Sequence, residues 1–137
     1  MSDRAATQPP TLPRVGGFPE PDGDQPMSAA EVRMVRTFLG LSQEHLAHML
    51  GVDVRTVKRW ESGYHAVPDR RRVQIEALED DAAHAVGVYA EQLAAAPDMV
   101  LTIPRDPAAP YPAGWWLMIA ARVAQEVPGL YVRFAED

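Results

Sequence analysis

Between residues 28 and 63, apolar positions recur at helical spacing in three short stretches. The first begins at Ser28, which forms a capping box with Glu31, and it ends at Gly40. Its apolar positions are Val32, Val35, Phe38 and Leu39. This pattern predicts an amphipathic helix that buries one face.

Two further helices are predicted around a glycine turn, over residues 42–63. Ser42 can cap the first of them, and Gly51 can take the left-handed conformation that ends a helix. Asp53 can cap the second, and Gly63 closes it. The apolar positions are Leu46, Ala47, Met49 and Leu50 on the first helix, and Val57 and Trp60 on the second.

A long helix is predicted from residue 69 to about 95, where Pro97 stops it. Its apolar residues stand at positions 75, 78, 82, 85 or 86, 89 and 93, in alternating steps of three and four. These positions form an apolar stripe, or seam, along the helix, and the three small helices before it cannot cover a seam of this length. Part of it therefore meets the C-terminal segment or a second subunit.

Beyond Pro97 the pattern changes to short β-prone runs. Met99 to Ile103 is such a run, a proline-rich connection spans 104–112, Trp115 to Val127 is an amphipathic helix, and Leu130 to Phe134 is a second β-prone run. If the two strands pair within one chain, the crossover makes them parallel. Two strands alone are marginal in water, so we expect pairing with the same element of a second subunit.

Composition sets the remaining limits. Residues 1–27 are rich in Pro, Gly and Asp and poor in large apolar side chains, which predicts a disordered arm. The 137 residues contain no cysteine and no apolar run near the roughly 20 residues that a membrane span requires. No secretory signal is present at the N-terminus, so a cytoplasmic protein is predicted.

The net charge of -6 is divided unevenly along the chain. Residues 28–72 hold eight Lys and Arg against five Asp and Glu, whereas residues 73–137 hold three Arg against ten acids. The basic part coincides with the three short helices. Such asymmetry suits a protein with one face that meets phosphates.

The outward side of the third helix carries Val54, Arg55, Thr56, Lys58, Arg59 and Ser62. A generic helical hairpin with a solvated face could look similar. However, a near-right-angle turn between two helices requires small or hydrophobic residues at set positions. The sequence has them at Ala47, Gly51 and Val52. The segment from Ser42 to Gly63 resembles the helix-turn-helix of the Cro/CI repressor type, the XRE-like family.

This resemblance implies a DNA-binding regulator with a lambda-repressor-like helical bundle. By the same resemblance, Arg36 is expected to pair with Glu61 and to brace the first helix against the third. The alternative is an Arg36 that lies free in solvent or on a phosphate. Gln43 occupies the family's phosphate-clamping position, and Val54 occupies a base-facing position that offers only an apolar contact.

Base reading is predicted for Arg55 and Arg59, because a guanidinium can donate two parallel hydrogen bonds to guanine. Thr56, Tyr64 and Arg70 are candidates for phosphate contacts. Lys58 is a further cation. It lies on a side of the predicted helix that could reach the bases as well as the phosphates.

The C-terminal part resembles a narrower group. The residues that carry this likeness are 59–63, 66–70 and Tyr111, Pro112, Ala113 and Gly114. They look like the small YdiL-like family, which includes anti-CRISPR-associated autoregulators with a C-terminal dimerisation domain. Outside the helix-turn-helix the shared residues are few.

Other chemistry is not indicated by the sequence. His45 and His48 lack a nearby third ligand, so solvated histidines are expected rather than a metal site. Trp115 and Trp116 are expected in the core or an interface, and Glu76, Glu79, Asp80 and Asp81 on a solvated helix face. No catalytic, cofactor or phosphate-loop arrangement is found, so the protein is predicted not to be an enzyme.

The fold class predicted is mainly α, in four parts. Residues 1–27 form an arm, 28–68 the helix-turn-helix domain, 69–96 a long helix and 97–137 a β-α-β dimerisation element. The function predicted is a nucleoid-associated homodimeric repressor that binds an inverted repeat in double-stranded DNA. Three alternatives are an antitoxin that also binds a toxin, a metabolite sensor with a pocket beneath Trp115, Trp116 and Tyr111, and a structural protein with a vestigial DNA motif. RNA as an added target stays open.

Overall fold

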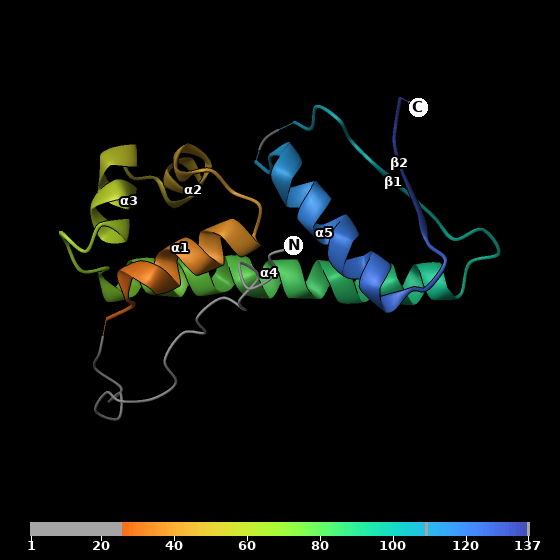
Figure 1. The fold of residues 1–137 in the computed structure, drawn as a ribbon, viewed down its shortest axis with the longest axis horizontal. Coiled ribbons are helices and arrows are strands. Elements are labelled where there is room, and N and C mark those ends of the chain that lie inside the picture. Colours follow the sequence, from red (N-terminus) through yellow and green to blue (C-terminus); the bar gives the residue numbers. More distant parts are fainter. Residues whose placement is uncertain (1–25, 109, 137) are drawn as a thin grey trace, which may run out of the picture.

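A computed structural model describes residues 26–108 and 110–136. A long helix, α4 (Asp69–Ala94), runs along the molecule, with α1 to α3 at one end and α5 and both strands at the other (Figure 1). Nearly all of the predicted arm lies outside the described residues. The mainly helical fold expected from the sequence is confirmed.

The three N-terminal helices are α1 (Ala29–Phe38), α2 (Gln43–Leu50) and α3 (Val54–Glu61). Each begins at the cap that the sequence indicates: Ser28 with its Glu31 capping box, Ser42 and Asp53. Gly51 ends α2 in the left-handed conformation, with a φ of 71°. The helices pack through a core whose most deeply buried side chains include Val32, Leu39, Leu46 and Val57.

The long helix α4 is covered along its length, as its apolar seam predicts. Near its start Ile75 is buried, and α4 contacts α2. Further along, Ala82 and Val86 are buried, and α4 packs against α5 (Ala113–Glu126). The buried apolar residues form one continuous cluster from Val32 to Val127.

Two short strands, β1 (Val100–Ile103) and β2 (Tyr131–Phe134), pair in parallel, as expected for a strand, crossover helix and strand. The register places Leu101 beside Val132 and Ile103 beside Phe134. Leu101 and Ile103 are buried, and both strands contact α5. The alternate residues form the other face of the sheet, on which Val100 is paired with Tyr131.

The two ends of the molecule also touch directly, which the sequence did not predict. Gly40, just after α1, lies so close to Gly114 in α5 that a Cβ on either residue would collide with the backbone carbonyl of the other. Beside this contact, the Arg122 guanidinium of α5 lies 4.7 Å from the ring centroid of Phe38 in α1. The C-terminal element is therefore anchored to α1 as well as to α4.

The aromatic residues considered for a ligand pocket pack on one another. Tyr111 stacks on Trp115 with ring centroids 4.5 Å apart, and Trp115 is buried. Trp116 meets Tyr111 edge-on, at 6.1 Å. A separate cavity of about 180 Å³ lies between Tyr89, Trp116 and β1. Within the two described ranges, no helix combines the length and apolar character that crossing a membrane would need.

Candidate nucleic-acid interface

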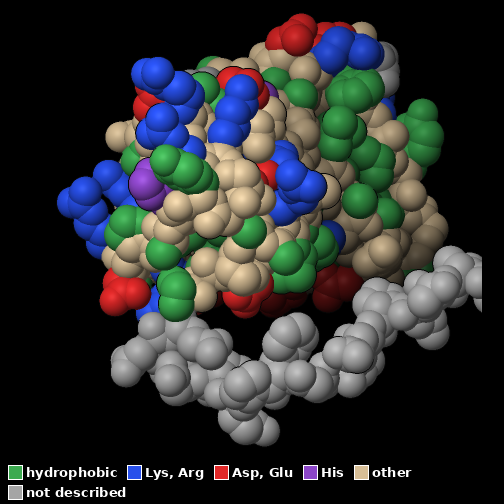
Figure 2. Space-filling model, turned by 60° about the vertical axis from the view of Figure 1, so that its left-hand side comes forward, with side chains coloured by type: hydrophobic (Ala, Val, Ile, Leu, Met, Phe, Trp, Pro, Cys, Tyr) green, Lys and Arg blue, Asp and Glu red, His purple; other side chains and the backbone are tan. Residues whose placement is uncertain are grey.

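Helix α3 has two opposite faces with different chemistry. Val57 and Trp60 are buried against the other N-terminal helices. Arg55, Lys58 and Arg59 are exposed on the outer side. Figure 2, in which this end of the molecule comes forward, shows Lys and Arg side chains spread over the surface. The arrangement presents a cationic ridge that residues 26–108 and 110–136 leave exposed.

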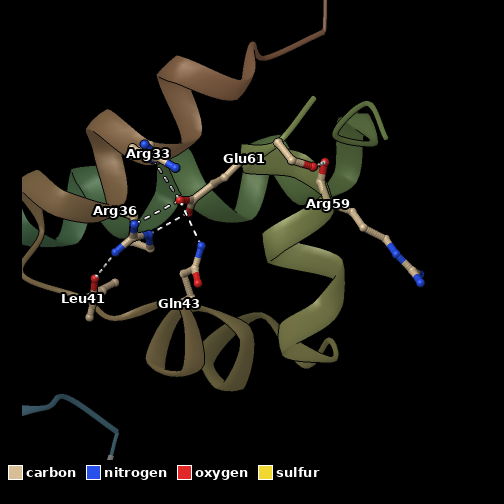
Figure 3. A network of polar contacts seen from close by, with 7 residues as sticks. Arg33, Arg36, Leu41, Gln43, Arg59 and Glu61 are labelled. Carbon is tan, nitrogen blue, oxygen red and sulfur yellow. Dashed lines mark hydrogen bonds and ion pairs between the residues drawn. The ribbon is translucent and has the colours of Figure 1, made fainter. Parts of the chain in front are cut away.

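Glu61, at the last turn of α3, is the centre of a polar network (Figure 3). Arg36 Nε donates to Glu61 Oε2 at 2.6 Å, and Arg36 Nη2 donates to Oε1 at 2.9 Å. Gln43 Nε2 and Arg33 Nε also donate to Oε1, at 3.2 and 3.4 Å. The Glu61 side chain is only 1% exposed, so these donors replace the water that its carboxylate loses. The ion pair between Arg36 and Glu61 that the resemblance implied is thus present.

The network determines the charge state of Glu61. Burial raises the pKa of its carboxyl, but hydrogen bonds from Arg36 and Gln43, together with the Arg36 charge, outweigh burial and hold the pKa below its usual value. The hydrogen bond with Glu61 in turn raises the pKa of Arg36. Both side chains are therefore charged at neutral pH.

Arg36 also orders the connection between α1 and α2. Its Nη1 donates to the backbone carbonyl of Leu41 at 3.0 Å. One guanidinium thus joins α1, the α1–α2 loop and α3. Gln43, which the sequence assigned to a phosphate, turns its amide nitrogen toward Glu61 and belongs to the same bracing network.

The remaining predicted contacts differ in their accessibility. Val54 is half-buried and packs against the core, which limits the apolar contact expected of it. Thr56 is also half-buried. Tyr64 is 75% exposed, and Arg70 is exposed at the start of α4. Their contacts with phosphates stay predictions.

Three contributions to this surface were missed by the sequence analysis. Arg33 joins the Glu61 network, one helical turn before Arg36. Arg71 Nη1 donates to the Leu50 carbonyl at 2.8 Å and thereby ties α4 to the end of α2. Asp53 Oδ1 accepts from the Arg55 side chain in addition to capping α3. The two-residue spacing of Asp53 and Arg55 was a usable signal, whereas the Arg33 and Arg71 contacts depend on tertiary packing.

Metal binding finds no support around these helices. His45 and His48 are exposed on α2. Among the residues that the structure describes, no group of three or more His, Asp or Glu side chains is placed to hold a metal ion.

A short helix anchored on its inner side by two preceding helices, with cations on its outer side, defines a helix-turn-helix DNA-binding domain. Residues 32–75 match the helix-turn-helix family, from within α1 to the second turn of α4. This segment is a Cro/CI-type, XRE-like helix-turn-helix. The match supports a DNA-binding transcription regulator. A comparison with curated proteins found no match.

Proposed function

We propose that this protein is a homodimeric repressor that recognises an inverted repeat through α3 in the major groove. The observation that carries the proposal is the exposure of Arg55, Lys58 and Arg59 on a helix whose Val57 and Trp60 are buried. An α-helix fits the major groove, where guanine presents two acceptors to an arginine. Phosphate contacts from Thr56, Tyr64, Arg70 and the second amide N–H of Gln43, the one not donated to Glu61, would hold α3 in register.

Arg59 and Arg70 form a matched pair for the test, because replacing either by alanine removes one exposed arginine. Arg59→Ala is expected to lose about 1 to 3 kcal/mol of discrimination between the preferred duplex and one with a substituted guanine. Arg70→Ala is expected to weaken binding to both duplexes by the same factor and to lower the salt slope by about one. Titrations of both duplexes at several salt concentrations measure these quantities.

Equal effects of Arg59→Ala on both duplexes would contradict a base-reading role for Arg59. Retention of full affinity by Arg70→Ala at low salt would contradict its phosphate role. Circular dichroism spectra and thermal unfolding of each variant serve as folding controls, since both side chains are exposed and their loss should leave the core intact.

The dimer is proposed to form at the sheet. β1 and β2 lie at the end of the molecule away from α3 (Figure 1), and α5 packs on one face of them. On the other face, the paired residues Val100 and Tyr131 are 40% and 63% exposed. Parallel sheets are generally covered on both faces, and two strands are marginal alone. A second copy of the same face would supply the missing cover.

Tyr131→Glu is expected to convert the dimer into a monomer at micromolar concentration, because it places two acids in the shared apolar contact. Val73→Glu is the control, because Val73 is a similarly exposed hydrophobic residue that lies on α4 outside the sheet. Mass measurement by light scattering distinguishes the two species. A monomeric wild type, or a Tyr131→Glu variant that stays dimeric, would contradict the sheet as the interface.

A further inference from the structure

Asp53 makes two contacts with Arg55 through a single oxygen. Its Oδ1 accepts the Arg55 backbone N–H at 2.8 Å, which caps α3, and the Arg55 Nε–H at 3.3 Å. The first contact is an ordinary helix cap and needs no charged side chain, since serine and asparagine serve as well. The second contact acts on the arginine side chain.

Asp53 and Arg55 are both largely exposed, at 56% and 75% of their side chains. An exposed ion pair contributes little to folding. The hydrogen bonds from Arg55, backbone first and then side chain, nevertheless lower the pKa of Asp53, so the carboxylate is charged at neutral pH. The pair therefore restricts where the Arg55 guanidinium points without being needed for the core.

The atoms engaged in the pair leave the base-reading end of Arg55 open. A guanidinium has five N–H donors in a planar fork, and Asp53 takes the one on Nε. The Nη1 and Nη2 donors at the far end are not used by Asp53, and this pair can reach guanine O6 and N7 together. Arg59 differs, because among the described residues no side-chain partner holds its guanidinium, which points away from the Glu61 network (Figure 3).

We infer that Asp53 is a specificity-determining residue that positions Arg55 for guanine and repels phosphates from the same end of α3. Both effects favour sequence-specific over non-specific binding. Because Asp53 already holds Arg55 in place, the Arg55 side chain loses less conformational entropy when it binds its base. The Asp53 carboxylate also repels the phosphates of a DNA backbone that approaches α3 out of register. This inference rests on the proposed function, because it assigns a role within the same DNA interface.

The test compares Asp53→Ser, which keeps the helix cap, with Glu44→Gln, which removes one exposed acid in the first turn of α2. Each is titrated with the preferred duplex and with a scrambled one. Asp53→Ser is expected to bind the scrambled duplex more tightly and to lower the affinity ratio about two- to fivefold, the range open to an exposed ion pair. Glu44→Gln should change both affinities by the same factor.

A second comparison shows whether Asp53 acts through Arg55. In an Arg55→Ala background, Asp53→Ser should leave discrimination at the guanine read by Arg55 unchanged. An equal loss in both backgrounds, or an unchanged ratio in Asp53→Ser, would overturn the inference. In the free protein, the Arg55 Nε–H signal in NMR spectra should exchange faster in Asp53→Ser than in the wild type. A wild type that binds all duplexes equally would instead overturn the proposed function, and with it this role.

Discussion

Glu61→Gln is expected to lower the free energy of unfolding at neutral pH by about 3 to 5 kcal/mol, the range for breaking a buried ion pair. Glutamine cannot supply the charge that balances Arg36, whose side chain is only 16% exposed. It also cannot accept all the donors that converge on Glu61 from Arg36, Arg33 and Gln43. Denaturation by urea, followed through tryptophan fluorescence, measures the loss. Glu44→Gln, an exposed change of the same kind, should stay within about 0.5 kcal/mol of the wild type.

The difference between wild type and Glu61→Gln should depend on pH. The pKa of Glu61 is lowered from its ordinary 4.5, so its stabilising contribution is fully present above pH 4.5 and is lost as pH falls through the lower, folded pKa. Glu79 acts in the opposite sense, because burial and then the neighbouring Glu76 and Asp80 raise its pKa. Both proteins share Glu79, so it cancels in the difference. A difference that stayed constant far below pH 4.5 would contradict the assigned role of Glu61.

Gly114→Ala is expected to lower the free energy of unfolding by about 1 to 3 kcal/mol, the usual cost of overpacking a tight contact. The added Cβ would meet the Gly40 carbonyl, which is backbone and cannot rotate away. Gly87→Ala is the matched control in α4, where nothing lies within 4 Å of the new methyl group. That exposed change should instead stabilise the protein by up to about 1 kcal/mol, because alanine favours helix over glycine.

Thermal and urea unfolding of both glycine variants measures the expected loss of stability in Gly114→Ala and the expected gain in Gly87→Ala. The Gly40 and Gly114 contact joins the N-terminal helices to α5, so the loss in Gly114→Ala reports on the packing between these two parts of the protein. A Gly114→Ala protein as stable as Gly87→Ala would show that the two segments do not approach as closely as the structure has them.

Local signals in the sequence predicted most of the fold. Ser28 with Glu31, Gly51 and Asp53 each act within one helical turn, so the ends of α1 to α3 follow from the residues themselves. The parallel pairing of β1 and β2 follows from the helix between them. These features need no knowledge of how distant segments pack.

Tertiary contacts account for what the sequence did not predict. The approach of Gly40 to Gly114 depends on where α5 lies, which no local pattern specifies. Val54 lies on the side of α3 expected to face DNA, yet it packs partly against the core. The Arg36 and Glu61 pair came from the family resemblance, whereas the additional donors from Arg33 and Gln43 emerge only when three helices converge.

Selection of bound duplexes from a random DNA pool tests the central claim most directly. If α3 reads bases from two related subunits, the selected sequences should contain an inverted repeat with guanines in each half, and half-site centres about 34 Å apart, one helical turn. An Arg55→Ala, Arg59→Ala double variant should recover no such repeat. A wild-type pool without any enriched sequence, at low salt where cationic surfaces bind DNA most strongly, would contradict sequence recognition by this helix.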